Sequence, residues 1–154
     1  MDKTDVRILH ALSKDSRASV DTIAETVNLS STPVRRRIKR LEDDGVIQNY
    51  GVAVDMKRCG YSLHLFILIK LKSRDSSTIA DFERRIINQP QITTCQLVTG
   101  SYDYILQVFL PNMEGYNEFL RSVLSELPGV FGLETSVVIS PVKETPSLPI
   151  AADY

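Results

Sequence analysis

Residues 35–40 place five basic side chains in six consecutive positions, in a chain whose formal net charge is only −1. Guanidinium and ammonium groups bind phosphates and the acceptor edges of bases, so this run is the first candidate for chemistry. On a helix that advances about 100° per residue, Val34, Ile38 and Leu41 share an apolar face, and the basic run lies opposite it and on its flanks. The preceding string "LSSTP" favours a helix start, and Gly45 favours its end. The pattern therefore predicts a helix with a basic outer face.

A basic helix face is most often only a solvated surface, so its context has to decide. Two short apolar-periodic segments precede it, one opening at Asp2 and the other at Ser19, and Asn28 suits the tight turn that follows. Two short helices joined by a tight turn, the second basic on its exposed face, form a helix-turn-helix that fits the major groove of DNA. We therefore predict a helix-turn-helix DNA-binding domain over residues 1–50.

The pattern changes after residue 62. The strings "YSLHLFILIKLK", "ITTCQLV", "YILQVFL" and "VFGLETSVVIS" are typical of strands. Between them, Ile79, Phe82, Ile86 and Ile87 indicate one amphipathic helix, and a second is predicted over 113–127. The order β-α-β-β-α-β, with a hairpin at Gly100, predicts a ferredoxin-like domain.

The whole chain is thus predicted to be α+β. A linker with a short β segment is expected over 51–62, the ferredoxin-like domain over 63–142, and a C-terminal tail over 143–154. In the first strand of that domain both alternating sets are apolar, Leu65 and Ile67 on one side and Phe66 and Leu68 on the other. A sheet that is apolar on both faces needs a second cover, and another copy of the chain would supply it. We therefore expect a homodimer.

Several other classes of protein are disfavoured by composition. Hydrophobic residues make up 43% of the chain and charged residues 24%, as in ordinary globular proteins. The N-terminal string "MDKTDVRIL" does not resemble a signal peptide, and the apolar run at 63–69 is too short to span a bilayer. Cys59 and Cys95 stand in no metal-ligand spacing. We expect a cytoplasmic protein with no metal, no cofactor, no catalytic residue and no membrane association.

Three strings resemble the Lrp/AsnC family of feast-or-famine transcription regulators: "MDKTDVRIL", "LSSTPVRRRIKRLEDDGVI" and "LVTGSYDYILQV". The resemblance extends over nearly the whole chain. It implies a winged-helix-type reader of double-stranded DNA, joined to a domain that oligomerises and binds an amino-acid effector. It also implies dimers that commonly assemble further, to octamers.

The resemblance also implies site residues, taken position by position. Ser31, Thr32 and Arg36 would meet base edges, and Arg35, Arg37, Lys39 and Arg40 would mostly meet phosphates, an assignment that the helix geometry also favours. The effector site would contain Thr99, Gly100, Ser101, Tyr102, Asp103, Tyr104 and Thr135. Leu133 stands where the family often has Thr or Ser, which favours an apolar amino acid as effector.

Each of these assignments has an ordinary structural alternative. Asp103 could simply cap the hairpin turn, and Tyr102 and Tyr104 could pack in a core or an interface.

Two other functions remain open on this sequence. One is an enzyme like the siroheme decarboxylases, which resemble the same two-domain architecture, although the second domain offers only His64 and few arginines for an acidic tetrapyrrole. The other is a regulator without effector that organises DNA by oligomerisation alone.

Overall fold

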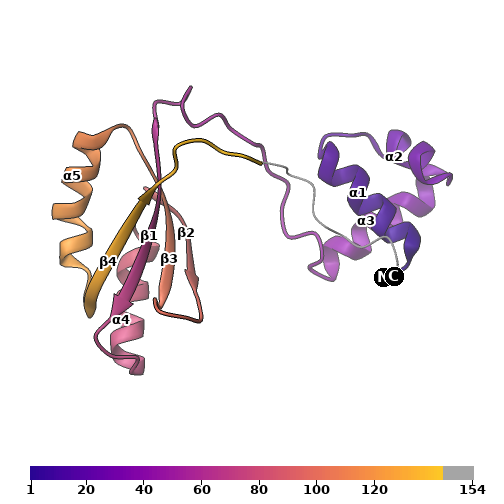
Figure 1. Cartoon of the computed structure of the whole chain (residues 1–154). Coiled ribbons are helices and arrows are strands. Elements are labelled where there is room, and N and C mark those ends of the chain that lie inside the picture. The colour runs from indigo at the N-terminus through magenta and orange to yellow at the C-terminus, as the bar shows by residue number, and fades with distance from the viewer. Residues whose placement is uncertain (144–154) are drawn as a thin grey trace. The chain divides into compact units, whose positions relative to one another are not determined.

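The computed structural model describes residues 1–143. Within them the chain forms two compact units, Met1–Ala53 and Val54–Pro141 (Figure 1). Each unit has a hydrophobic core of its own. None of the helices described there is long and apolar enough to cross a membrane.

The first unit consists of three helices, α1 (Lys3–Lys14), α2 (Val20–Val27) and α3 (Ser31–Asp43). Asp2 and Asp5 form a reciprocal capping box at the start of α1, and the Ser19 side chain caps α2. Asn28 ends α2 with a left-handed φ of 55°, which agrees with the predicted turn. The core is formed by one face of each helix and contains Ile8, Ile23, Ala24, Val27, Val34 and Leu41.

The start of α3 agrees with the prediction from "LSSTP", whereas the β segment predicted after this helix is absent. Ser30 occupies the cap position of α3 but makes no side-chain capping hydrogen bond, and the Ser31 hydroxyl donates to Asp21 instead. The short β segment expected within 51–62 is absent, and residues 56–60 form turns. A strand needs a hydrogen-bonded partner, and no segment of the described chain pairs with residues 46–62.

The second unit is a four-stranded sheet in the order β2-β3-β1-β4. Its strands are β1 (Leu63–Leu71), β2 (Ile92–Leu97), β3 (Tyr104–Leu110) and β4 (Val130–Val137), and every neighbouring pair is antiparallel. The helices α4 (Ser76–Ile87) and α5 (Met113–Ser122) connect them, with the short 3-10 helix η1 (Leu124–Glu126) after α5. This is the predicted ferredoxin-like arrangement.

Both helices cover the same face of the sheet (Figure 1). The core lies between these helices and every second residue of the central strands β1 and β3. Ile67 on β1 and Leu106 on β3, for example, are fully buried. Two details of the predicted helices differ. Ile87, expected on the buried face, is 81% exposed because it is the last residue of α4, turned about 100° from buried Ile86. The helix expected over 113–127 is α-helical only to Ser122 and tightens into η1.

On the opposite face of the sheet, the part of the chain that the structure describes places no helix. This face presents Phe66 and Leu68 from β1 and Phe109 from β3, and Phe66 is 38% exposed. The His64 ring stacks on Phe109 with the ring centroids 4.3 Å apart, and its Nε2 lies 3.0 Å from Nε2 of Gln107. The strand β1 therefore has one apolar face that is buried from Leu65 to Leu71 and one that is partly exposed, as the two alternating sets predicted. We call this second surface the open face.

Candidate nucleic-acid interface and ligand site

The outer face of α3 presents part of the basic run to solvent. Thr32, Arg35 and Arg36 are exposed, and the Lys39 ammonium lies 3.4 Å from Asp43 one turn later, with both side chains largely exposed. Surface ion pairs of this kind are weak, so Lys39 can exchange Asp43 for another anion. Val34 and Leu41, on the opposite side of the helix, are buried in the core. Packing of this apolar stripe therefore turns the basic side chains outward.

Arg37 and Arg40 are held differently. The Asp5 carboxylate, whose side chain is fully buried, accepts from Arg37 Nη1 at 2.8 Å and from Arg40 Nη2 at 2.7 Å. Arg37 Nη1 also donates to Asp2 at 2.6 Å. The Asp5 N–H, followed by the Arg37 guanidinium, lowers the pKa of Asp2, and the two carboxylates raise the pKa of Arg37. Two of the five basic side chains are thus engaged within the protein.

Ser31 is engaged as well. Its hydroxyl donates to Asp21 near the start of α2, so the contact links the two helices of the helix-turn-helix. Of the seven predicted DNA contacts, four side chains therefore face solvent without a buried partner, namely Thr32, Arg35, Arg36 and Lys39.

In the second unit, the loop between β2 and β3 contains most of the predicted effector residues. Gly100 adopts φ 126°, which only glycine accepts easily, and this turn brings Asp103 back under β1. A cavity of about 320 Å³ lies beside the loop, and it is lined by Leu71, Arg74, Ile79, Leu97, Val98, Thr99, Asp103 and Tyr104. Its walls are mostly apolar, with Arg74, Thr99 and Asp103 as polar groups.

Asp103 is almost completely buried in this cavity wall. One of its oxygens accepts the Leu71 N–H at 2.8 Å, and the other accepts Arg74 Nε at 2.7 Å. The Leu71 bond and then Arg74 lower the pKa of Asp103, against the opposing effect of burial. Asp103 therefore ties the loop to β1 and positions Arg74, and it does more than cap a turn.

Two tyrosines flank Asp103 and differ in their surroundings. The Tyr104 ring is buried, and its hydroxyl donates to Glu83 on α4 at 2.7 Å; burial, followed by this hydrogen bond, raises its pKa. The Tyr102 hydroxyl donates to Glu134 on β4 at 2.6 Å. Glu134 is opposite Leu68, which places this contact on the open face.

The predicted effector residues therefore do not converge on a single cavity of this chain. Thr99, Asp103 and Tyr104 line the cavity beside the loop, whereas Gly100 and Ser101 are exposed at the turn. Thr135 is opposite buried Ile67, and its hydroxyl accepts from Tyr116 on α5 at 3.0 Å, so it belongs to the helix-covered face. Arg74 and Glu83 were not predicted, because each lies in a different sequence segment from the loop and meets it only in the folded sheet.

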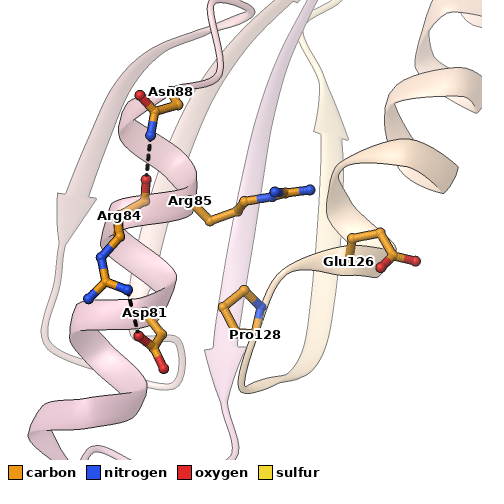
Figure 2. A pocket seen from close by; sticks show the side chains of 6 residues that line it. All are labelled: Asp81, Arg84, Arg85, Asn88, Glu126 and Pro128. Carbon is orange, nitrogen blue, oxygen red and sulfur yellow. Dashed lines mark hydrogen bonds and ion pairs between the residues drawn. The ribbon is translucent and has the colours of Figure 1, made fainter.

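A second cavity, of about 500 Å³, lies between α4 and η1 (Figure 2). Arg84 pairs with Asp81 at 3.1 Å, and Arg85 extends across the gap on the side of Glu126 (Figure 2). The lining contains the acidic Asp81 and Glu126 and the basic Arg84 and Arg85, so this cavity has no preference for a ligand of one charge. Among residues 1–143, no group of three His, Cys, Asp or Glu side chains could hold a metal ion.

A helix-turn-helix with a basic outer helix face, followed by an α+β unit with a ligand-sized cavity, is the organisation of two-domain transcription regulators. The family model described as the Lrp/AsnC ligand-binding domain matches residues 64–148, and a winged helix-turn-helix DNA-binding model matches residues 1–48. This chain belongs to the Lrp/AsnC family of DNA-binding transcription regulators, as the sequence resemblance indicated.

Relatives and solved structures agree over nearly the full length. The chain is 35% identical to the Bkd operon transcriptional regulator of Pseudomonas aeruginosa, covering 92% of this chain and 93% of the relative. It is 35% identical to the leucine-responsive regulatory protein of Salmonella typhimurium, covering 97% and 92%. A Neisseria meningitidis regulator solved with L-methionine superposes with a TM-score of 0.91 at 32% identity, covering 97% and 96%. These names agree with the prediction of a regulator over an enzyme.

Proposed function

We propose that an amino acid bound beside the 98–103 loop modulates DNA binding or assembly of this regulator, which acts in the cytoplasm. The observation that supports the proposal is the cavity of about 320 Å³ beside that loop. Its volume is within the range of small-ligand pockets, and its apolar walls meet a few polar groups, as such pockets do. The similar Neisseria regulator was solved with L-methionine, a ligand of this class.

The lining favours an apolar effector. Leu71, Ile79 and Leu97 offer apolar contact to a side chain, and the Arg74 guanidinium offers a charge partner for an α-carboxylate. Thr99 can hydrogen-bond the ligand, and the N–H groups of the exposed turn at Gly100 and Ser101 can add further bonds. Contacts by Tyr102 and Thr135 stay predictions, since neither side chain lines this cavity.

DNA reading is assigned to α3. In this proposal Thr32 and Arg36 meet base edges, with Ser31 beside them at the helix start, while Arg35 and Lys39 meet phosphates. The exposed outer face of α3 supports these roles. We further propose that two chains associate through the open face, whose apolar side chains are otherwise left partly in water. Assembly to an octamer stays a prediction.

The test is a thermal-shift screen of the twenty amino acids, followed by fluorescence anisotropy on DNA with each compound that binds. A duplex recovered by in vitro selection with the native chain serves as the probe, and a scrambled duplex is the control. We expect an apolar amino acid to raise the melting temperature with its concentration, because it binds only the native state, and to change affinity for the selected duplex. A flat screen with intact selective DNA binding would instead support the regulator without effector.

A further inference from the structure

The basic side chains of α3 fall into two groups that differ in their contacts. Five basic side chains lie within residues 35–40. Arg35, Arg36 and Lys39 are exposed and have no buried partner, whereas Arg37 and Arg40 both bind the buried Asp5, and the Arg40 side chain is still 53% exposed. The Arg37 side chain is only 25% exposed. The charge that DNA would meet is therefore smaller than the sequence suggests.

Both oxygens of the Asp5 carboxylate accept hydrogen bonds within this cluster. Its Oδ1 accepts Arg37 Nη1 at 2.8 Å, and its Oδ2 accepts both Arg40 Nη2 at 2.7 Å and the Asp2 N–H at 2.9 Å. A buried carboxylate is tolerated only when it is paired and hydrogen-bonded in this way. Since Asp5 is on the first turn of α1 and the arginines lie on successive turns of α3, the cluster fixes α3 in rotation as well as in distance. We call Asp5, Arg37 and Arg40 the clamp.

We infer that Asp5 is a positioning residue for DNA reading: its ion pairs with Arg37 and Arg40 join α1 to α3 and orient α3 so that Arg36 faces bases and Arg35 and Lys39 face phosphates. Arg37 and Arg40 then do not serve as phosphate contacts, in contrast to the roles that the family resemblance implied for them. The inference rests on the proposed assignment of α3 as the DNA-reading helix. In this inference Asp5, a residue of the α1 capping box, also determines how selectively the protein binds one DNA sequence over another.

The salt dependence of DNA affinity distinguishes a phosphate contact from a side chain that only positions α3. Each phosphate contact releases counterions, so losing one lowers the slope of log affinity against log salt concentration by about 0.9. A positioning side chain contributes no such release, but its loss lets α3 rotate and weakens discrimination between DNA sequences. Destabilisation alone lowers the active fraction of protein without altering the slope.

The experiment measures anisotropy at four salt concentrations, on the selected and the scrambled duplex, with active protein counted by stoichiometric titration. The variants are Arg37→Gln, Arg40→Gln and, as the phosphate-contact reference, Arg35→Gln. We expect Arg35→Gln to lower the slope by about 0.9 per chain and keep the selectivity ratio. Arg37→Gln and Arg40→Gln should keep the slope on the scrambled duplex and reduce the selectivity ratio about tenfold, the effect of one lost base contact.

A charge-matched variant removes the remaining ambiguity. Asp5→Asn combined with Arg37→Gln keeps the native net charge and leaves no buried ion, yet it dismantles the clamp. We expect this double variant to lose selectivity to a similar degree. The inference is overturned if Arg37→Gln and Arg40→Gln lower the slope as Arg35→Gln does, or if the double variant keeps native selectivity. Failure of the native chain to select any duplex would instead overturn the proposed function itself.

Discussion

Arg74 Nε lies 2.7 Å from Asp103 Oδ1, joining the segment after β1 to the loop before β3 across 29 residues of sequence. The same carboxylate accepts the Leu71 N–H and is almost completely buried, while Arg74 remains 64% exposed. The wall of the cavity beside the loop therefore contains a buried carboxylate whose guanidinium partner is still largely exposed. The proposed effector would therefore contact the residues that join β1 to the loop between β2 and β3.

Replacement of Asp103 by Asn should destabilise the second unit in a pH-dependent way. Ionised Asp103 is stabilised in the folded state, because its pKa there is lower than the ordinary 3.8. The stability it contributes is present above pH 3.8 and is lost as the pH falls through the folded pKa. We expect a loss of about 2 kcal/mol at pH 7, typical of hydrogen bonds to a charged group. Urea unfolding from pH 7 to pH 2.5 should show the variant and the native chain converging in acid.

Tyr102→Phe is the matched control for that experiment. Tyr102 lies in the same loop as Asp103, and its replacement by Phe removes only an exposed hydrogen bond to Glu134 on β4. We expect it to change stability by less than about 0.5 kcal/mol at any pH. An Asp103→Asn deficit that stays constant down to pH 2.5 would contradict the assigned role of the ionised carboxylate.

Gly129→Ala should strain the turn before β4 in two separable ways. Gly129 has φ 71°, and an added Cβ would lie 2.3 Å from the Thr78 methyl carbon. We expect a loss of about 3 kcal/mol, from the left-handed backbone together with the overpacking. Gly45→Ala has nearly the same φ, 70°, and nothing within 4 Å of its Cβ, so it should lose only about 1 kcal/mol. Chemical denaturation measures both.

The Thr78→Ser background tests the clash directly. Serine removes the methyl group and keeps the hydroxyl that donates to Asp75 at 2.8 Å. Gly129→Ala should then lose little more than Gly45→Ala does. An equal loss in the Thr and Ser backgrounds would show that Thr78 is not the obstacle.

Arg36→Ala should reduce sequence discrimination more than general DNA affinity. Arg36 is exposed on α3 and has no ion-pair partner among the described residues, so it is available for a base edge. A bidentate base contact contributes about 1–3 kcal/mol of discrimination. Anisotropy on the selected and scrambled duplexes should show that loss, whereas Arg121→Ala, an exposed arginine on α5, should leave both affinities unchanged. Retention of full discrimination by Arg36→Ala would remove Arg36 from the reading face.

Phe66→Asp should prevent self-association through the open face. Phe66 is 38% exposed in the single chain, so a charge there can stay hydrated in the monomer but not against a partner copy. We expect light scattering after size exclusion to show a dimer or larger assembly for the native chain and a reduced mass for the variant. Ile87→Asp, at an apolar residue that is 81% exposed on α4, should leave the mass unchanged. If Phe66→Asp keeps the native mass, the interface lies elsewhere.

The sequence was sufficient for the fold because its signals are local. Helix periodicity, the cap at Ser19, the turn at Asn28 and alternating apolar residues in β1 act within a few residues of one another, and they agree with the tertiary packing. The predictions that were wrong concern a segment that pairs with no strand and the ends of two helices. Residues 46–62 pair with no strand of the described chain. The helix predicted from residue 113 onward changes to a 3-10 helix after Val123, although its apolar spacing continues.

The sequence by itself therefore determined the two-unit architecture, the basic outer face of α3 and the family to which the chain belongs. Only the tertiary structure decided which charged groups are free. Arg37 and Arg36 are adjacent and chemically identical, yet Asp5, 32 residues away from Arg37, engages one and not the other. Asp103 likewise meets Arg74 only when β1 and β3 pair. The availability of a charge depends on partners distant in sequence, and such partners are brought together only by folding.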